Sequence, residues 1–479
     1  MTETEGGGVP ALAIRPGAPP SQADPPARPA AEGPRWALGR LVVVVALLTG
    51  IVGLFATVGA DSRWLAALGR IIIARGAIPR GVPFAAASTA HWANTLVAAE
   101  LIFDGLERAL GDRGLVIADM VAVAFAFALL AWDARAQGAG SRPTATSLAL
   151  VALGAFPSLA VVRVQLFSLV LFPVLVAVLR MESRNPSRRI WLVLPVLALW
   201  SNLHGAALSG LAVLWVYLAL YRARREPWTA VAVAVSSLIA MCLTPAGIRT
   251  ADYYYGLVTN VAAERGVGQW EPLGHSPFDW VMIAVLVILA LRMRHRLPPL
   301  WECATIILLA ALTVKAARDG VWLLFFLVAP SARAQRPGRD WHGLLPVGAV
   351  VAVALIAIDL VHPLHSPGAP KATVASAVRL ADGSPILADP IPAEQIALVG
   401  GRIWSGNPLD AFSHRVQTEY VDWISGSAGG RAALDNGQIR IVLVTAGSSD
   451  AQVTAADPAF VRVAANSSTV LYERRPAKQ

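Results

Sequence analysis

Residues 57–112, TVGADSRWLAALGRIIIARGAIPRGVPFAAASTAHWANTLVAAELIFDGLERALGD, form the longest interruption between the hydrophobic segments of this chain. Asp61 lies three residues after a run of apolar side chains, where we expect an acid at the edge of a bilayer. Two amphipathic segments, near 62–75 and 92–109, follow it and are separated by a region rich in Pro and Gly. The stretch therefore predicts a loop that holds a carboxylate at the surface of a membrane.

The composition on both sides of this loop predicts a membrane protein. Of 479 residues, 56% are hydrophobic and only 15% are charged, whereas a soluble protein carries about 25% charged residues. Repeated apolar runs approach the length that crosses the hydrocarbon core of a bilayer. We predict a polytopic α-helical membrane protein with about eleven transmembrane helices, in a domain of residues 36–361, at 36–58, 113–133, 144–161, 164–180, 190–204, 206–221, 228–245, 278–291, 299–313, 320–332 and 343–361.

The distribution of basic residues predicts the orientation. Arginine is concentrated in alternate loops, and the short loops between them hold few basic residues. Since cytoplasmic loops carry the excess of Lys and Arg, we expect a multi-pass protein of the cytoplasmic (inner) membrane with its N-terminus inside. The net charge of +9 then reflects topology and does not indicate nucleic acid as a partner. The arginine-rich loops are 134–143, 181–189, 222–227, 292–298 and 333–342.

The two ends of the chain differ from this pattern. Residues 1–35 are rich in Pro, Gly and Ala, which predicts a disordered cytoplasmic tail. Residues 362–479 predict a small α/β or α+β domain outside the membrane, on the same side as the 59–112 loop, and they contain no recognisable catalytic motif. The expected strands are SPILADP (384–390), IALVGGRIW (396–404), IRIVLVTA (439–446) and STVLYERR (468–475), with one helix over 409–424.

Polar and aromatic residues gather at the predicted outer ends of the spans. Charged groups at such depth cost a few kcal/mol unless they are paired or hydrated, so each is a functional candidate. Each also has an ordinary explanation, as an interface anchor, a helix cap or a packing residue. Together they predict an external cavity for an anionic head group. The set is Asp61, Glu100, Arg163, Gln165, Asn202, His204, Trp270, Glu271, Lys315 and Arg318.

The order of motifs resembles that of the bacterial GT-C-type integral membrane glycosyltransferases, over most of residues 36–335. The first loop carries Asp61, Trp64 and Gly69-Arg70, then the turn GAIPRGVPF and a helix with Trp92, Asn94 and Ala99-Glu100-Leu101. Further matches are RVQLFSL (163–169), WSNLHG (200–205), the loop that contains Trp270-Glu271, and ARDG (317–320). The loop departs from the pattern at three places: Leu65 and Val82 replace a His and an Asp of the family, and the run Asn94-Thr95-Leu96-Val97 lacks the family's His and acid.

The resemblance implies transfer of a sugar from a polyprenyl-phosphate donor to an acceptor on the outer side of the membrane. Asp61 would be the general base for the acceptor hydroxyl. Arg163, Arg318 and Lys315 would bind the lipid phosphate, and Gln165, Asn202 and His204 would orient phosphate or sugar. Glu100, Trp270 and Glu271 would complete the substrate-binding set. A divalent cation, Mg²⁺ or Mn²⁺, stays open because one firm carboxylate is little for such a site.

Two other classes of function remain. A catalytically inactive relative that serves as a binding or assembly subunit would explain the altered loop positions. A transporter or flippase of an anionic lipid-linked sugar would need a similar cationic cavity, but it is expected to show internal repeats and polar residues at mid-membrane. The identity of the sugar and of the acceptor is not encoded in any of these motifs.

Overall fold

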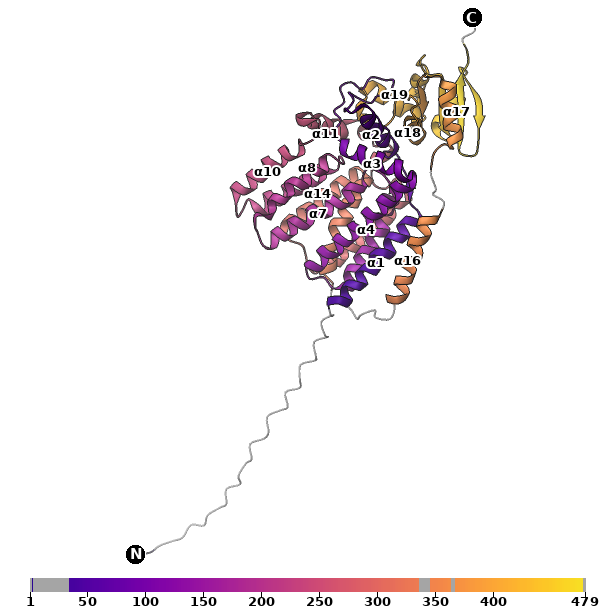
Figure 1. The fold of residues 1–479 in the computed structure, drawn as a ribbon. Helices are drawn as coiled ribbons and strands as arrows, with labels where there is room; N and C mark the ends of the chain where they lie inside the picture. Colours follow the sequence, from indigo (N-terminus) through magenta and orange to yellow (C-terminus); the bar gives the residue numbers. More distant parts are fainter. Residues whose placement is uncertain (1, 3–33, 336–344, 363–366, 477–479) are drawn as a thin grey trace.

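The computed structural model of this protein describes residues 2, 34–335, 345–362 and 367–476. Long helices run side by side in a bundle, and the C-terminal domain lies at one end of it, next to α2 and α3 (Figure 1). The tail predicted for residues 1–35 falls almost entirely outside the described residues, since α1 begins at Pro34. The last arginine-rich loop, 333–342, is described only as far as residue 335.

A helix lies over each of the eleven predicted spans. Pairs of helices that are distant in sequence pack together, such as α1 with α16 and α5 with α15. The helices of the bundle are α1 (Pro34–Leu54), α4 (Asp112–Ala136), α5 (Ser141–Gly154), α6 (Phe156–Ala160), α7 (Leu166–Arg184), η1 (Arg188–Leu192), α8 (Val193–Ser201), α9 (Ala207–Tyr217), η2 (Leu218–Arg222), α10 (Pro227–Met241), α13 (Pro277–Met293), α14 (Leu300–Lys315), α15 (Gly320–Arg333) and α16 (Leu345–Val361).

Only some of these helices could cross a bilayer unaided. Within the described residues, α4 and α7 are long and apolar enough by length and composition. The predicted span 144–161 contains two helices, α5 and α6. The helix at 190–204 begins with 3-10 geometry (η1) and the helix at 206–221 ends with π geometry (η2), which single hydrophobic runs do not reveal. The number of membrane crossings therefore stays a prediction.

The core of the bundle is aromatic. The side chains of Trp200, Trp301 and Trp322 are fully buried, and Phe172 packs between two of them, with its ring 6.4 Å from Trp200 and 5.3 Å from Trp322. Such rings bury a large apolar area in defined edge and tilted geometries. They fix the relative positions of α7, α8, α14 and α15, whose ends carry the polar groups described below.

The first loop folds into two packed helices, α2 (Arg63–Arg75) and α3 (Val97–Leu110). The second predicted segment began at residue 92, but residues 92–96 are irregular and the helix starts at Val97. The two helices approach closely at Gly69, where an added Cβ atom would lie 2.1 Å from the carbonyl oxygen of Glu100. A side chain larger than hydrogen does not fit there without movement of the backbone.

We expect Gly69→Ala to destabilise the protein by about 1–3 kcal/mol, the range for an overpacked contact, because neither backbone can yield freely. Thermal unfolding of the purified protein measures this. Gly105→Ala is the matched control, since Gly105 lies in α3 with nothing within 4 Å of its added Cβ. Alanine there should be neutral or stabilising. Equal destabilisation by both variants would show that the α2–α3 contact does not set stability.

The C-terminal domain is an α/β unit built on a four-stranded sheet. Its strand order is β3-β4-β6-β5, with β3 and β4 parallel and the other two pairings antiparallel. Its elements are α17 (Lys371–Ala381), β3 (Ile386–Ala388), α18 (Pro390–Leu398), η7 (Leu409–Ala411), α19 (His414–Ile424), η8 (Ala428–Gly430), α20 (Arg431–Leu434), β4 (Ile441–Thr445), α21 (Ser449–Ala455), β5 (Phe460–Ala465) and β6 (Thr469–Arg474).

The predicted elements of this domain differ from the structure at two strands and one helix. The strand expected at 396–404 is wrong, because α18 continues to Leu398 and the chain then turns at Gly400 and Gly401. A short apolar run such as IALV does not distinguish a buried strand from the end of a helix. The strand β5 was not expected, and the helix predicted over 409–424 is confined to α19 after a short 3-10 turn.

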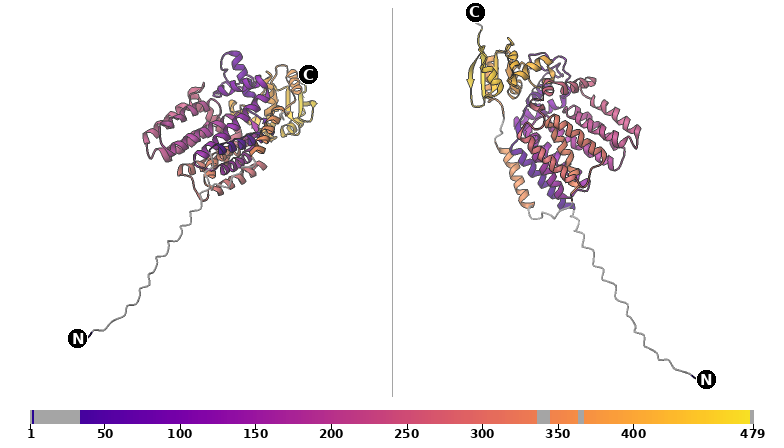
Figure 2. Two further views of the ribbon diagram at one scale, coloured as in Figure 1. Left: turned by 60° about the horizontal axis from the view of Figure 1, so that its bottom comes forward. Right: turned by 180° about the vertical axis from the view of Figure 1, so that it is seen from behind.

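The first loop and the C-terminal domain are joined by backbone hydrogen bonds. Ala86 and Ala87 donate their N–H groups to the carbonyl oxygens of Ile403 (2.8 Å) and Trp404 (3.1 Å), and Ile403 donates to Phe84 (2.9 Å). Ile403 also bridges to β3. Figure 2 shows from two further sides that this domain lies against the loop end of the bundle. The 84–87 segment thereby places the loop beside the sheet of the domain.

Candidate functional site

A two-residue parallel pairing brings the start of the first loop to the start of α7. Strand β1 (Thr57–Val58) pairs with β2 (Val161–Val162), and Gly59 donates its N–H to the carbonyl of Val162 at 3.1 Å. A Cβ atom on Gly59 would lie 2.4 Å from the Val161 side chain and 3.2 Å from Nε of Arg163. The glycine therefore allows Arg163 to lie against the segment that leads into Asp61.

Asp61 is held in an unusual backbone conformation by the C-terminal domain. Its φ is +78°, in the left-handed region that non-glycine residues rarely adopt and that costs about 1–3 kcal/mol. The carboxylate of Glu394, in α18, accepts the N–H of Asp61 at 2.7 Å and the N–H of Arg63 at 3.1 Å. Asn407 donates to the same carboxylate at 2.8 Å. Glu394 thus fixes the turn that aims Asp61.

The Asp61 carboxylate begins a chain of polar contacts that ends on a cation. Trp64 donates its indole N–H to Oδ1 at 3.3 Å, and Gln269 donates to Oδ2 at 3.2 Å. The other end of the Gln269 amide accepts a long hydrogen bond from Arg318, at 3.5 Å. The Arg318 guanidinium lies over the ring of Trp270, 3.7 Å from its centroid. Gln269 therefore links the predicted base to the predicted phosphate ligand.

Arg163 and His204 are the other predicted site residues near Arg318. Burial lowers the pKa of Arg318, and the nearby charges of Asp319 and Asp61 oppose this while that of Arg163 adds to it. Nε of Arg163 is buried without a hydrogen-bond partner in the described part of the protein. The charge of Arg318 also reaches His204, which shares a 2.6 Å hydrogen bond with the hydroxyl of Ser168. Arg163, His204 and Arg318 thus lie near one another.

A second carboxylate of the C-terminal domain lies close to Asp61. Asp410 accepts the indole N–H of Trp92 at 2.9 Å, and the Trp92 ring packs edge-on against Trp64, 6.3 Å away. Tyr253, in α11 (Thr250–Thr259), is buried among the charges of Asp410, Asp61 and Arg318, and burial raises its pKa well above the ordinary value. Trp92 and Tyr253 therefore both lie near the two carboxylates.

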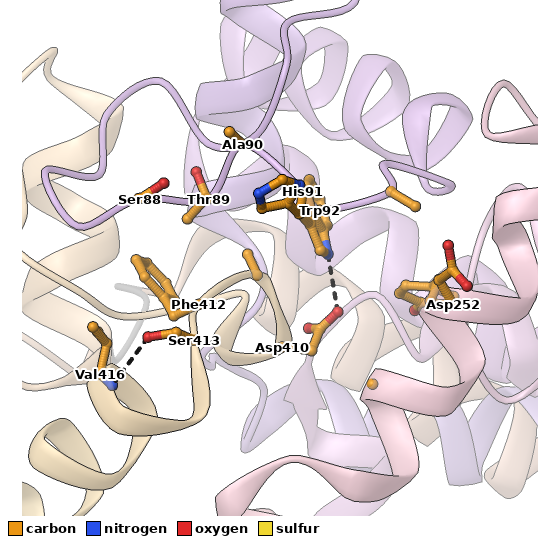
Figure 3. Close-up of a pocket in the computed structure, with 14 residues that line it drawn as sticks. Ser88, Thr89, Ala90, His91, Trp92, Asp252, Asp410, Phe412, Ser413 and Val416 are labelled. Carbon is orange, nitrogen blue, oxygen red and sulfur yellow. Dashed lines mark hydrogen bonds between the residues drawn. The ribbon is translucent and has the colours of Figure 1, made fainter.

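A solvent-facing hollow of about 350 Å³ opens beside this pair (Figure 3). Its lining combines the rings of Trp92 and Phe412 with the carboxylates of Asp252 and Asp410 and the hydroxyl of Thr89. Three separate segments form it: the first loop, α11 and the C-terminal domain. The hollow gives a ligand with both apolar and hydroxyl groups a place beside Asp410, at the end of the bundle where the C-terminal domain lies.

Five of the predicted site residues have no side-chain hydrogen bond or ion pair with this cluster in the described residues. Asn202 donates to the carbonyls of Ala198 (2.8 Å) and Leu243 (2.7 Å), and it joins the ends of α8 and α10. Glu100 is buried between α2 and α3, where Asn94 donates to it at 3.0 Å. The others are Gln165, which precedes α7 as its N-cap, and the exposed Lys315 and Glu271.

The three altered loop positions are packed in the apolar core. Leu65 is fully buried, and Val82 and Leu96 are nearly so. Polar residues of the family pattern are thus replaced here by side chains that stabilise α2 and the loop.

Several residues of the cluster carried no signal in the sequence. Glu394 and Asp410 are ordinary acids of a small domain without a motif, and only folding brings them to Asp61. Gln269 and Tyr253 lie in the long 246–277 loop, where the adjacent Trp270 was the only hint. Trp64 and Trp92 belong to the loop motif, but their contacts with the two carboxylates required the structure.

No group of three or more His, Cys, Asp or Glu side chains that could hold a metal ion is present in the residues the structure describes. The two cysteines, Cys242 and Cys303, are free. The three nearby acids, Asp61, Glu394 and Asp410, instead use their oxygens to accept hydrogen bonds from protein N–H groups. Binding of a divalent cation therefore stays open.

The buried carboxylates of Glu394 and Asp410 in the C-terminal domain predict that the stability of the protein depends on pH. Burial, with the nearby charge of Asp61, raises the pKa of Glu394 to about 7, and burial raises that of Asp410 to about 6. Between the ordinary carboxyl value and these values the folded state binds more protons than the unfolded state, so stability falls as pH rises through this window. We expect a higher unfolding temperature at pH 5 than at pH 7.5.

Glu394→Gln provides the control for this pH effect, because it removes one of the two titrating groups. The difference in unfolding temperature between the two pH values should shrink in this variant, while the share of Asp410 remains. A slope of the same size in wild type and variant would show that Glu394 does not titrate in this range.

Comparison with known proteins supports the fold. No family model and no curated protein matches the chain in sequence. Among solved structures, ArnT from Cupriavidus metallidurans bound to undecaprenyl phosphate superposes with a TM-score of 0.52 at 14% identity, over 92% of this chain and 98% of ArnT. ArnT in the apo state gives 0.50 at 13% identity, over 91% and 97%. The arabinofuranosyltransferase AftD from Mycobacteria gives 0.48 at 16% identity, over 93% of this chain and 42% of AftD.

Both ArnT structures superpose on the bundle and on the C-terminal domain, so the likeness extends over the whole fold. This likeness in fold agrees with the resemblance in the order of the loop motifs. The chain therefore shares the fold of ArnT, as the resemblance to the GT-C-type membrane glycosyltransferases predicted.

Proposed function

We propose that this protein is a membrane glycosyltransferase that moves a sugar from a polyprenyl-phosphate donor to an acceptor on the outer side of the cytoplasmic membrane. The observation that carries this proposal is the Asp61 cluster. It contains a carboxylate held in a strained turn, linked through Gln269 to Arg318, with Arg163 close by. One ArnT structure contains undecaprenyl phosphate, a ligand of the kind expected here.

The cluster supplies what the transfer needs. An ionised aspartate accepts hydrogen bonds only, and its two oxygens together have about four lone-pair positions. Trp64 and Gln269 use one on each oxygen, which leaves acceptor capacity for the proton of a substrate hydroxyl. As the hydroxyl oxygen bonds to the anomeric carbon, its proton passes to Asp61 and the bond from that carbon to the phosphate oxygen breaks.

The cations receive the charge that the leaving phosphate develops. Arg318 offers a planar fork that suits phosphate, and the ring of Trp270 holds it in place. The buried, unpartnered Nε of Arg163 is a donor that a phosphate oxygen would satisfy. His204 stands behind this pair, fixed by Ser168. These groups stabilise the transition state without rearranging.

The test is release of free polyprenyl phosphate by the purified protein in nanodiscs, across a panel of polyprenyl-phosphate sugars. Turnover with one donor class is the expected result. Donor binding without turnover for every sugar and acceptor would favour the inactive binding or assembly subunit. No binding of any donor would identify the cationic residues as ordinary interface anchors. Movement of the intact lipid-linked sugar across the bilayer of sealed proteoliposomes would favour a flippase.

Arg318→Ala should weaken donor binding about 10–100-fold, the loss expected for a hydrogen bond to a charged group, since it removes both the fork and the stacked cation. Binding of a polyprenyl-phosphate sugar to the protein in nanodiscs measures this. Arg80→Ala removes the same charge from an exposed position in the first loop and is the control. Equal effects of the two variants would assign the role of Arg318 to general surface charge.

A further inference from the structure

A second polar hollow, of about 370 Å³, lies at the opposite end of the bundle from Asp61. Helix α7 connects the two regions, with Arg163 three residues before its first residue and Arg180 in its last turns. The helical part from Leu166 to Arg180 rises by roughly 21 Å at about 1.5 Å per residue. The hollow also receives residues from the α13–α14 loop, α14 and α15. The arginine-rich loops predict this end to face the cytoplasm.

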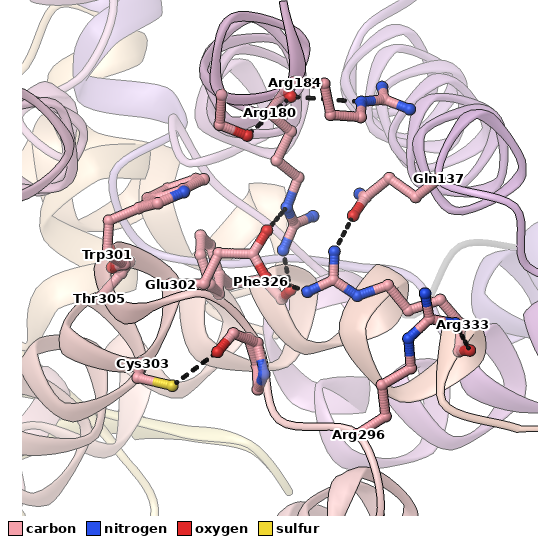
Figure 4. Close-up of polar contacts among 12 residues, drawn as sticks. Gln137, Arg180, Arg184, Arg296, Trp301, Glu302, Cys303, Thr305, Phe326 and Arg333 are labelled. Carbon is pink, nitrogen blue, oxygen red and sulfur yellow. Dashed lines mark hydrogen bonds and ion pairs between the residues drawn. The ribbon is translucent and has the colours of Figure 1, made fainter. Parts of the chain in front are cut away.

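The lining of this hollow carries more positive than negative charge. It contains the four guanidiniums of Arg180, Arg184, Arg296 and Arg333, and one carboxylate, that of Glu302 (Figure 4). Glu302 pairs with Arg180 at 3.2 Å and with Arg333 at 2.6 Å. Asp133 adds a second carboxylate, 2.6 Å from Arg180. Four cations thus share two anions.

The uncompensated charge belongs to the two exposed arginines. Arg296 donates to the carbonyl of Arg333 at 3.2 Å, and Arg184 donates to the carbonyls of Arg180 and Ala136. Within the described ranges, no carboxylate lies at ion-pair distance from either guanidinium. Each keeps N–H groups for a ligand, since a guanidinium has five.

The buried wall of the hollow contains an unsatisfied donor. The side chain of Trp301 is about 1% exposed, and its indole N–H has no hydrogen-bond partner in the described part of the chain. A buried donor without a partner costs roughly 1–3 kcal/mol. An anion in the hollow would face the excess positive charge, and one of its oxygens would accept the N–H of Trp301.

We propose that this hollow is a binding site for a phosphate-bearing anion, separate from the donor site. Arg184 and Arg296 provide the charge-assisted hydrogen bonds, and the buried pairs of Arg180 and Arg333 with Glu302 hold the wall in shape. Basic pockets between helices at the cytoplasmic side of membrane proteins suit the head groups of anionic lipids. Free phosphate offers the same oxygens, so the lipid and soluble sources share one chemistry.

The test measures binding of radiolabelled inorganic phosphate to the full chain in a phosphate-free detergent, by equilibrium dialysis against chloride of equal ionic strength. All proteins carry Arg163→Ala and Arg318→Ala, which together remove both proposed phosphate contacts near Asp61. We expect one saturable site in this background. The pair Arg184→Ala and Arg296→Ala should weaken it about tenfold or more, as loss of charge-assisted contacts does.

Arg294→Ala is the matched control, because Arg294 is exposed in the same loop and contacts His295 at 2.7 Å outside the hollow. It should bind phosphate as the background protein does. Arg296→Lys should retain part of the affinity, since the positive charge remains. Absence of a saturable site, or equal weakening by Arg294→Ala, would overturn the proposal.

Native mass spectrometry distinguishes the two possible sources of phosphate, a lipid head group and a soluble compound. The protein is incubated with phosphatidylcholine vesicles that contain cardiolipin, and the cardiolipin that stays bound is measured. Cardiolipin retained by the background protein and lost in the Arg184/Arg296 variant would identify a lipid head group. Phosphate binding without cardiolipin retention would identify a soluble phosphate compound. Both outcomes support the site, and neither depends on glycosyl transfer, so failure here and failure of the proposed activity are distinguishable.

Discussion

Asp61→Asn is expected to lower donor turnover by about 10²–10⁴-fold, the usual contribution of a positioned general base. The amide keeps the size of the side chain and can still accept from Trp64 or Gln269, but it cannot take a proton from a hydroxyl. Donor binding should change little, because the phosphate is held by Arg318 and Arg163. Release of polyprenyl phosphate, with donor affinity measured separately, gives both quantities.

Asp435→Asn is the control for this substitution, since Asp435 is an exposed acid of the C-terminal domain. It should leave turnover unchanged. If Asp61→Asn retained turnover within a fewfold of wild type, Asp61 would not be the base, and the nearest alternative would be Asp410, whose pKa is raised to about 6. If it abolished donor binding as well, the carboxylate would serve binding instead of proton transfer.

Glu394→Gln is expected to reduce turnover about 10²-fold, although Glu394 is a positioning residue and lies behind the reacting groups. Its two oxygens accept the N–H groups of Asp61 and Arg63, and an amide offers only one oxygen for the two donors. One N–H then loses its partner, and the turn with φ +78° at Asp61 relaxes. A displacement of about 1 Å in a catalytic group can cost such a factor.

Separate measurements of turnover and of donor binding distinguish a positioning role of Glu394 from general destabilisation. Glu394→Gln should lower turnover while the affinity for the donor stays near wild type. Glu419→Gln, in which the lost carboxylate pairs with the exposed Arg415 at 2.8 Å, should change neither. A parallel loss of turnover and donor binding in Glu394→Gln would indicate that the domain interface has opened and that Glu394 has no specific effect on Asp61.

The candidate site was predicted in part. Asp61, Arg163, His204, Trp270 and Arg318 were selected from their places at the ends of apolar segments, and the structure brings them together. Asn202 and Glu100 met the same criterion but bind within the protein, because a polar residue near a helix end serves a cap or an interhelical contact equally well. The position of a residue in the sequence therefore does not distinguish a site residue from one that caps a helix or joins two helices.

The sequence by itself determined the helical bundle, since apolar runs longer than a strand can only be buried or placed in lipid. It also determined the order of the first-loop motifs and the presence of an α/β domain at the C-terminal end. Only the tertiary structure decided that Glu394 and Asp410 of this domain lie beside Asp61, across more than three hundred residues of sequence. The physical reason is that hydrophobic periodicity specifies which face of an element is buried, whereas the partner of that face depends on packing and on backbone hydrogen bonds such as those of residues 84–87 with 403–404.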